Sequence, residues 1–245
     1  MTDIAKKSQR AFPSPDRFRA LCRSAGFSLS GPQEEKLGRY LDLVLEANRK
    51  FNLTAVRDRE EAWVRHVYDS LLLLPHLAGA KSVVDIGSGA GLPGIPLAVM
   101  RGDLRVTLLE ATRKKADFLA VTASELGLSG IKVLCARAEN AGHDPAHRGR
   151  YDAAVVRAVG SVAELAELAM PFLKMNGILA ALKGAAVEED VRGAARALRI
   201  LKARTEGIQM AGEGDAVSWI LTLRKTGPTP AAYPRLPGTP KKTPL

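Results

Sequence analysis

The sequence contains little cysteine and has no long hydrophobic run. Its 245 residues include two cysteines, Cys22 and Cys135, which are too few for a disulfide framework or a zinc cluster, so we assign no metal site. No apolar stretch approaches the roughly 20 residues that cross a bilayer. The basic N-terminus is not followed by the apolar segment of a secretory signal. We therefore expect a cytoplasmic protein that does not enter a membrane.

Acidic residues are scarce relative to basic ones. There are 26 acidic against 36 basic side chains, so the net charge is +10. A basic surface attracts polyanions, of which nucleic acid is the commonest in a cytoplasm, although charge can also serve solubility alone. Residues 224–245 carry five basic side chains, no acidic one and six of the 14 prolines. This composition predicts that residues 226–245 form an extended basic tail outside the core.

The remaining chain shows helical patterns first and alternating strands and helices afterwards. We expect residues 1–80 to form a small helical region whose first 14 or so residues are flexible, with a helix that Asp58 caps. The expected strands cover residues 81–87, 105–110, 131–137, 151–159, 177–184 and 218–225. Residues 188–203 are expected to be helical. Continuous apolar strands between amphipathic helices indicate an α/β fold over residues 81–225, with a doubly wound, mostly parallel sheet.

A glycine-rich turn in VVDIGSGAGLPGIPLA (residues 83–98) follows the first strand. Ligands of open α/β sheets lie beyond the carboxyl ends of the strands, and Gly87, Gly89 and Gly91 let bare backbone approach one. The dinucleotide fingerprint is G-x-G-x-x-G, but here Leu92 occupies the position of its third glycine. Asp85 would crowd a pyrophosphate, whereas it suits a cofactor with ammonium and sulfonium charges. The pattern therefore favours S-adenosylmethionine over a nicotinamide dinucleotide.

Two further strand ends carry candidate contacts for a nucleoside. Glu110 ends the second expected strand and can accept hydrogen bonds from ribose hydroxyls, a device that enzymes of both cofactors use. Ala138 and Glu139 follow the third strand and could flank an adenine. Together with the glycine turn they predict a Rossmann-like methyltransferase of class I. A nicotinamide-dependent oxidoreductase, or a glycine turn that serves only the topology, is the alternative.

The loop after the fourth strand bears on the atom that is methylated. Residues 155–162 lack the Asn/Asp-Pro-Pro-aromatic tetrad that commonly accompanies methylation of an exocyclic amine. Cys135 lies in an apolar strand and not where a nucleophile for a pyrimidine carbon is usual. A target with a free lone pair remains, such as guanine N7. Such a target loses no proton, so we nominate no catalytic base.

Several cations are candidates for contacts with ligand or RNA. Arg157 ends the fourth strand, where its guanidinium either makes planar contacts to the cofactor or target base, or reaches solvent. Arg65 and Asp69 are four residues apart and could form a surface pair beside His66 and Ser70. The side chains that we assign to RNA contact are Arg65, His66, Arg113, Lys114, Lys183, Arg235, Lys241 and Lys242.

Five segments of the chain together resemble the glucose-inhibited division protein B family: NLTAVRD, RHVYDS, DIGSGAGLPGIPLA, RAVGS and ALKG. The members of this family are bacterial 16S ribosomal RNA guanine-N7 methyltransferases. The resemblance covers roughly residues 20–245, including the ending YPRLPGTPKKTPL. It implies that a guanine in the decoding-centre loop of 16S rRNA is methylated. Many relatives have Thr-Gly-Pro where this chain has Ser88-Gly89-Ala90, and some have Asp in place of Glu110, but the size or charge is kept.

The resemblance also implies cofactor contacts by Gly87, Leu92, Ala138, Glu139 and Arg157. The complete set that we predict for S-adenosylmethionine is Asp85, Gly87, Ser88, Gly89, Gly91, Leu92, Glu110, Ala138, Glu139 and Arg157. The expected partner is 16S rRNA or the small ribosomal subunit, bound by a monomer. The alternatives are a methyltransferase for another RNA, a protein or a small molecule, the oxidoreductase above, and an RNA-binding module without catalysis.

Overall fold

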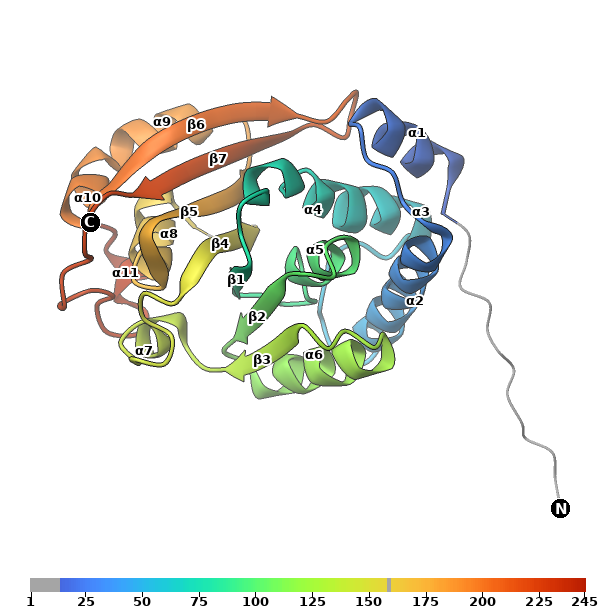
Figure 1. The fold of residues 1–245 in the computed structure, drawn as a ribbon, viewed down its shortest axis with the longest axis horizontal. Helices are drawn as coiled ribbons and strands as arrows, with labels where there is room; N and C mark the ends of the chain where they lie inside the picture. Colours follow the sequence, from blue (N-terminus) through green and yellow to red (C-terminus); the bar gives the residue numbers. More distant parts are fainter. Residues whose placement is uncertain (1–13, 158–159) are drawn as a thin grey trace, which may run out of the picture.

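A seven-stranded sheet runs through the computed structural model, which describes residues 14–157 and 160–245. Its strand order is β3-β2-β1-β4-β5-β7-β6 (Figure 1). The strands are β1 (Ser82–Ile86), β2 (Arg105–Glu110), β3 (Ile131–Cys135), β4 (Tyr151–Arg157), β5 (Leu173–Lys183), β6 (Ala203–Ala211) and β7 (Ser218–Lys225). The pairs among β1 to β5 are parallel, and β7 is antiparallel to both β5 and β6. The predicted α/β fold with a mostly parallel sheet is confirmed.

Strand β6 was not expected from the sequence. The predicted helical stretch of residues 188–203 is instead two short helices, α9 (Val187–Gly193) and α10 (Ala195–Ile200), followed directly by this strand. An edge strand has one neighbour, and most side chains of β6 are exposed or half-buried. Backbone pairing with β7 therefore forms the strand without the apolar run that marks a central one.

Helices cover both faces of the sheet and produce two apolar clusters. Alternate residues of a strand point to opposite faces, so Val83 and Leu108 join one cluster whereas Val84 and Leu109 join the other. The helices are α5 (Gly94–Met100) and α6 (Arg113–Glu125) on the first face, with α7 (Ala138–Ala141), α8 (Val162–Ala169) and α10 on the second. This arrangement is the doubly wound one that the alternating pattern predicts.

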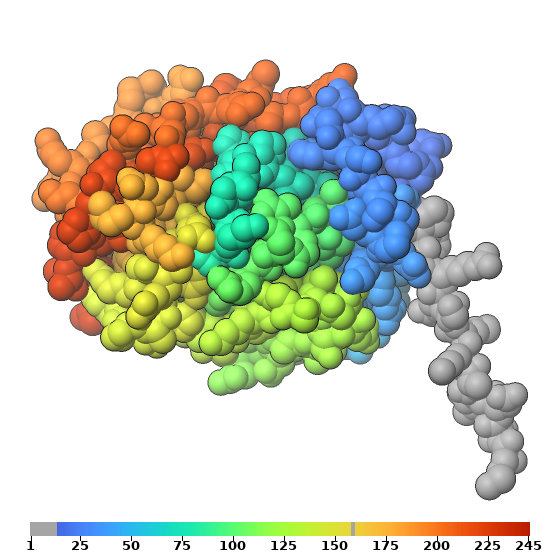
Figure 2. Space-filling view, viewed as in Figure 1, coloured from blue at the N-terminus to red at the C-terminus, as the bar shows by residue number. Residues whose placement is uncertain are grey.

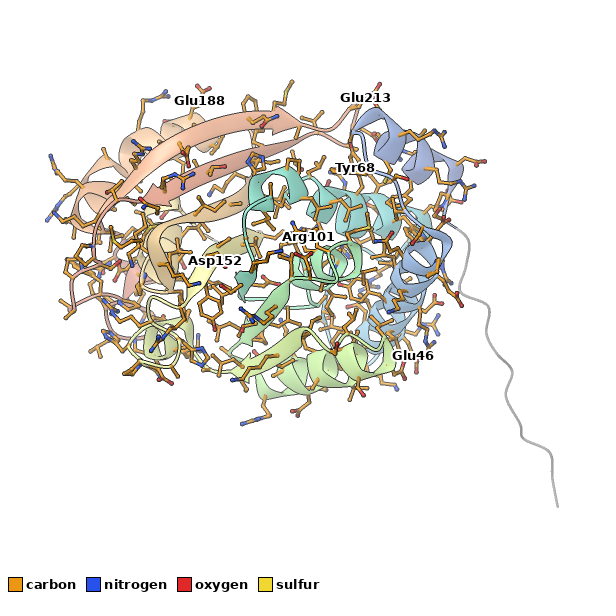
Figure 3. The ribbon with its side chains drawn as sticks, in the orientation of Figure 1. Glu46, Tyr68, Arg101, Asp152, Glu188 and Glu213 are labelled. Atoms are coloured by element: carbon orange, nitrogen blue, oxygen red, sulfur yellow. The ribbon has the colours of Figure 1, made fainter. Side chains whose placement is uncertain are left out.

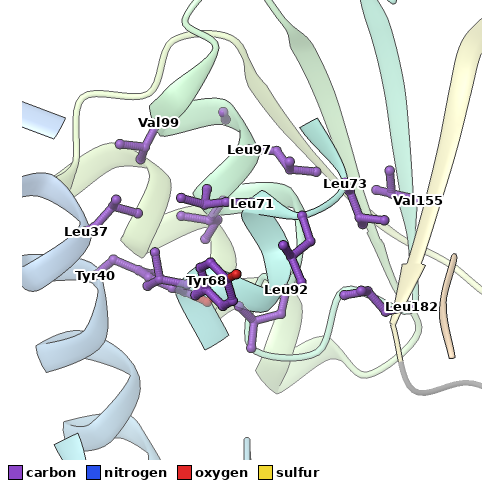
Figure 4. Packing of buried hydrophobic residues seen from close by; sticks show 14 of the residues in the cluster. Leu37, Tyr40, Tyr68, Leu71, Leu73, Leu92, Leu97, Val99, Val155 and Leu182 are labelled. Atoms are coloured by element: carbon purple, nitrogen blue, oxygen red, sulfur yellow. The ribbon is translucent and has the colours of Figure 1, made fainter. Parts of the chain in front are cut away.

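The N-terminal helices share the first of these clusters. They are α1 (Asp16–Ser24), α2 (Gly31–Asn48), α3 (Arg59–Ala62), a π-helical turn (Trp63–Tyr68), α4 (Asp69–Leu71) and a 3₁₀ turn (Leu74–Leu77). Figure 4 shows Leu37 and Tyr40 pointing from α2 toward Leu71 and Leu92. The hairpin tip between β6 and β7 lies beside α1, where the Ser24 hydroxyl donates to Glu213 at 2.8 Å (Figure 3). The helical region therefore packs as part of the same core.

The helix expected from Asp58 begins as predicted but does not continue regularly. The Asp58 carboxylate accepts a hydrogen bond from the Glu61 backbone N–H at 2.8 Å. After one α-helical turn the chain widens into the π-helical turn, which carries Arg65 and His66. Such π-helical turns are rare and occur frequently at functional sites. The apolar spacing that predicts a helix does not distinguish the two forms.

The expectation of an extended C-terminal tail is wrong. Residues 226–245 lie against the surface of the domain (Figure 2). They include a short helix, α11 (Thr239–Lys242), which contacts α8. The Arg148 guanidinium donates to the backbone carbonyls of Thr229 and Tyr233, each at 2.9 Å. Prolines prevent regular strands or helices, but their extended backbone leaves carbonyls that a neighbouring arginine can bind.

Two other expectations concern the chain ends and membranes. The first 13 residues, for which we expect flexibility, lie outside the described residues. Across residues 14–157 and 160–245, no helix combines the length and apolar character needed to cross a membrane.

Candidate functional site

The glycine-rich loop lies beyond the carboxyl end of β1, as predicted. Gly87, Gly89 and Gly91 have φ angles of +72°, +56° and +98°, a region that other residues adopt at a cost. The backbone N–H groups of Gly87 and Ser88 donate to the Leu109 carbonyl at 2.8 and 3.1 Å. These bonds hold the loop against the end of β2, and its three glycines leave the backbone uncovered by side chains.

Asp85 lies beneath this loop and is completely buried. Its Oδ2 accepts a hydrogen bond from the Gly94 backbone N–H at 3.0 Å, whereas Oδ1 has no partner among the described residues. Burial raises the pKa of the carboxyl to about 7, and the hydrogen bond from Gly94 offsets this in part. A buried carboxyl with an unpaired oxygen is a site that a positive charge would stabilise in its ionised form.

Gly94 has a role that the sequence reasoning missed. A Cβ atom there would lie 2.4 Å from Leu108 Cδ2 and 2.7 Å from Asp85 Oδ2, so glycine alone lets α5 approach the strands this closely. Leu92 occupies the place of the third glycine in a dinucleotide fingerprint, but the close helix–strand contact is made two residues later. The order Leu92-Pro93-Gly94 was the available signal.

Glu110 connects the loop to the start of α6. Its Oε2 accepts a hydrogen bond from the Gly89 backbone N–H at 3.0 Å, and its Oε1 accepts one from Thr112 N–H at 2.7 Å. A carboxylate offers about four acceptor positions, so this side chain can accept further bonds from ligand hydroxyls. The predicted contact of Glu110 with a ribose stays a prediction.

Tyr40 is a second residue that the sequence reasoning missed. It lies on the buried stripe of α2, and its hydroxyl donates to the carbonyl of Ala90 in the glycine-rich loop at 3.0 Å. Helical spacing identifies the buried face of α2, but it cannot show that the face meets the loop. The bond ties the N-terminal helices to the site.

Arg157 reaches the same edge of the sheet from the end of β4. Its Nη1 lies 3.3 Å from Nδ1 of His66, whose Nε2 lies 2.9 Å from Oγ1 of Thr54. A guanidinium can only donate hydrogen bonds, so Nδ1 of His66 is the acceptor. The ring proton is then on Nε2, which donates a hydrogen bond to Oγ1 of Thr54. Burial, and then the charge of Arg157, lower the pKa of His66 to about 4. The imidazole is therefore neutral at physiological pH.

Asp69 and His66 are buried, which corrects the expectation of a surface cluster. Burial raises the pKa of Asp69 to about 6, whereas the charges of Arg157 and Arg65 act in the opposite direction. Within the predicted cluster of Arg65, His66, Asp69 and Ser70, only Arg65 is exposed. The His66 ring lies beside Arg157 inside the site, and its assignment to RNA contact stays a prediction.

Glu139 and Ala138 lie in the first turn of α7, beyond β3. The Glu139 carboxylate is buried, and its Oε1 accepts a hydrogen bond from the Gly238 backbone N–H at 2.8 Å. The C-terminal segment therefore reaches this edge of the sheet. The middle of RAVGS, residues 158 and 159, lies outside the described residues.

Besides Arg65 and His66, six basic residues are assigned to RNA, and they fall into two groups. Arg113, Lys114, Lys241 and Lys242 are exposed, and the Lys114 ammonium lies 4.6 Å from the centre of the Phe51 ring. These four assignments stay predictions.

The other two cations, Lys183 and Arg235, are engaged within the protein. Lys183 forms an ion pair with Asp190 and donates to the carbonyl of Gly160, each at 2.8 Å. Arg235 forms an ion pair with the buried Glu167 at 2.6 Å. These contacts give both side chains a structural partner and lend no support to an RNA contact.

Comparisons with protein families identify relatives along most of the chain. The model of the GidB family, described as rRNA small subunit methyltransferase G, matches residues 33–217. Ribosomal RNA small subunit methyltransferase G of Moorella thermoacetica is 41% identical over 231 residues, which cover 92% of this chain and 96% of that protein. The protein of the same name from Deinococcus radiodurans is 42% identical over 219 residues, with 87% and 86% covered.

Solved structures share the fold at lower identity. The O-methyltransferase TomG from Streptomyces achromogenes, in complex with SAM, is 20% identical with a TM-score of 0.54, covering 77% of this chain and 90% of its own. The O-methyltransferase from Bacillus cereus, in complex with SAH, is 17% identical with a TM-score of 0.54, covering 76% and 91%. At these identities the likeness shows the architecture alone, and it agrees with the Rossmann-like sheet described above.

Proposed function

Because the chain belongs to the rRNA small subunit methyltransferase G family, we propose that it transfers the methyl group of S-adenosylmethionine to N7 of a guanine in the decoding-centre loop of 16S rRNA. The observation that carries the proposal is the family match, which spans the helices and strands that build the site. The glycine-rich loop over a buried carboxyl supports it independently. An oxidoreductase would need room for a pyrophosphate in place of Asp85.

The residues at the edge of the sheet fit a cofactor with two positive charges. Asp85 has an unpaired buried oxygen and a pKa near 7, so an adjacent cation would favour its carboxylate form. The loop exposes backbone where a side chain would fill the space, and Glu110 offers acceptors for hydroxyl groups. The residues that we propose to hold S-adenosylmethionine are Asp85, Gly87, Ser88, Gly89, Gly91, Leu92, Glu110, Ala138, Glu139 and Arg157.

The chemistry asks for alignment and not for a base. When bound, S-adenosylmethionine supplies a methyl group on a positively charged sulfur. Guanine N7 carries a lone pair and no proton, so no side chain of this protein has to remove one. The contribution of the chain is then to orient the acceptor in line with the methyl group. Arg157 is suited to this task, because His66 and Thr54 fix its position and its other N–H groups remain as donors.

Exposed cations around the site are proposed to hold the RNA backbone. Arg65 is exposed next to His66, Arg113 and Lys114 are exposed at the start of α6, and Lys241 and Lys242 are exposed on α11. Binding that uses such contacts releases counterions from the phosphates and weakens steeply as salt concentration rises. We propose that the protein acts in the cytoplasm on 16S rRNA or on small-subunit particles.

We also propose a monomer. Among the described residues, the large apolar side chains that are exposed belong to four separate segments: Val121, Met175, Met210 and Leu236. Stable homodimers usually bury a contiguous apolar patch. Sedimentation equilibrium of the purified chain measures its mass in solution and tests this directly.

The experiment for the proposed activity follows a methyl group. The protein is incubated with labelled S-adenosylmethionine and with undermethylated 16S rRNA or small-subunit particles, and the label is mapped by cleavage at N7-methylguanine. We expect one labelled guanine, and none with Gly87→Val, whose side chain would fill the cofactor space. Label that appears only on protein or small molecules would reject the proposal. Comparing naked RNA with particles identifies the acceptor.

A further inference from the structure

The C-terminal segment, residues 226–245, is attached to the domain by side chains from the region between α7 and β4. The Arg148 guanidinium binds two of its carbonyls, and a ring nitrogen of His143 lies 2.7 Å from the Pro234 carbonyl oxygen. A Cβ atom on Gly142 would lie 2.8 Å from the Pro234 ring, so the segment is also in close contact here. These contacts define one path for the segment over the surface.

Arg235 is the main anchor of the segment. Its backbone N–H and its guanidinium both bind the Glu167 carboxylate, with distances from 2.6 to 3.1 Å. Glu167 lies on α8 and is completely buried. A buried carboxylate needs such a partner, because burial of an unpaired charge is strongly unfavourable. The segment therefore supplies the charge that neutralises an acidic group of the core.

Three residues after this anchor, the segment reaches the proposed cofactor site. The Gly238 backbone N–H donates to Oε1 of Glu139 at 2.8 Å. Among the described residues this is the one hydrogen-bond donor to the Glu139 carboxylate, and it leaves Oε2 as an acceptor for a ligand. The cavity between the segment and α7, about 400 Å³, is lined by Glu139 and by Arg235, Leu236 and Pro237.

We propose that residues 226–245 are a clasp that positions Glu139 for S-adenosylmethionine, with Arg235 as its anchoring residue. The clasp fixes one carboxylate oxygen through Gly238, so that the other faces the ligand in a single orientation. This inference rests on the proposed function, because it requires the cofactor to lie at Glu139. It also explains why a basic, proline-rich ending is folded against the domain instead of extending into solvent.

Reciprocity gives the clasp a measurable consequence. If clasp docking favours cofactor binding, cofactor binding must stabilise the docked clasp by the same free energy. We therefore expect S-adenosylhomocysteine, used as the probe, to slow hydrogen exchange of the backbone amides in residues 228–242. A segment that serves only the stability of the fold would show no such response.

The test uses the full chain without RNA. Calorimetry gives the Kd for S-adenosylhomocysteine, and hydrogen exchange is measured with and without it. We expect Arg235→Met to raise the Kd about tenfold, and Arg235→Lys to raise it less because part of the pairing remains. Arg224→Met is the matched control, because it breaks the ion pair with Glu206 at the opposite end of the strands and should leave the Kd unchanged.

The outcomes separate this inference from the proposed function. A wild-type chain that binds no S-adenosylhomocysteine contradicts the proposed function itself. A wild-type chain that binds it, with the glycine-rich loop protected and residues 228–242 unaffected, overturns the clasp alone. If Arg235→Met unfolds because Glu167 is left unpaired, the exchange measurement on the wild-type chain still decides.

Discussion

The two sides of the site are held together in different ways. The glycine-rich loop is shaped by backbone bonds to Leu109 and by carboxylates at the ends of β1 and β2, all within about one βαβ unit. The group around Arg157 comes from segments far apart in the sequence and is joined by side chains, through His66 to Thr54. The shape of the loop therefore depends on glycines, which have no side chain, whereas the Arg157 group depends on contacts between side chains.

The difference extends to charge. Asp85 is buried beneath the loop without a cationic partner, and its pKa rises to about 7. Asp69 is similarly buried, but the charges of Arg157 and Arg65 oppose the rise, and its pKa reaches about 6. The carboxyl beneath the loop thus has no cationic partner until a positively charged ligand binds, whereas Asp69 already has Arg157 as its partner. The two sides should respond differently to substitution and pH.

The largest effect is expected where the loop side has no space. Gly94→Val should raise the Kd for S-adenosylhomocysteine about 100-fold, because the new side chain collides with Leu108 and Asp85 and displaces the loop. Calorimetry measures the Kd, and thermal unfolding shows whether the domain still folds. Gly102→Ala is the control, since a Cβ atom there meets nothing within 4 Å. An unchanged Kd for Gly94→Val would mean that α5 does not need this close approach.

A substitution on the other side should separate catalysis from cofactor binding. Arg157→Lys keeps the charge but loses the planar donor group, so we expect kcat/KM for RNA to fall about 30-fold, or ~2 kcal/mol. The Kd for S-adenosylhomocysteine should rise less than for Gly94→Val, because Arg157→Lys removes one of several proposed cofactor contacts and leaves the loop in place. Methylation rates at saturating cofactor provide the measurement. Equal losses in both quantities would show that the two sides act as one unit.

The pH dependence of binding tests the carboxyl beneath the loop. Because the pKa of Asp85 is about 7 in the free protein, a cationic ligand that favours the carboxylate must release a proton below that pH. S-adenosylmethionine should therefore bind about tenfold more weakly at pH 6 than at pH 8. His66 does not contribute, since its pKa of about 4 keeps it neutral over this range. Asp69, with a pKa of about 6, ionises at the lower end of this range, so Asp85→Asn should remove most of the dependence. A variant that retains all of it would assign the proton to another group.

The smallest effect is expected for the bond that joins α2 to the loop. Tyr40→Phe removes the hydroxyl that donates to Ala90 and should raise the Kd for S-adenosylhomocysteine about threefold. Tyr68→Phe is a matched control, because Tyr68 is equally buried but lines a cavity between α1 and β6. Comparison of the two Kd values measures the contribution of the helical region to the loop. Equal values would limit that region to a packing role.

Much of the loop side could be predicted from the sequence. The pattern is local: Gly87, Gly89 and Gly91 follow an apolar strand, Asp85 precedes the first glycine, and Glu110 ends the next strand. Its cause, the backbone freedom of glycine at the end of a strand, is local too. The role of Gly94 escaped this reasoning, because a close contact depends on how helix and strand pack. The position of Tyr40 escaped it for the same reason: helical spacing predicts burial but not the partner of a hydroxyl.

The Arg157 group and the C-terminal segment were harder to predict. His66 has the spacing of a helix face, and only the π-helical turn and the packing of α3 and α4 place it beside Arg157. Residues 226–245 have the composition of an extended tail, since proline and lysine are typical of one. Composition contains no information about Glu167, the buried acid that Arg235 neutralises from a distance of 68 positions.

The sequence by itself determined every strand of the sheet except β6, the glycine-rich loop and the kind of ligand that the loop can hold, because these follow from periodicity and from backbone freedom over short stretches. The tertiary structure alone decided which remote side chains meet at the edge of the sheet and that the C-terminal segment packs against the domain. Burial is the physical reason. It makes an unpaired charge costly, so the final position of a charged residue depends on the partner that the fold places beside it.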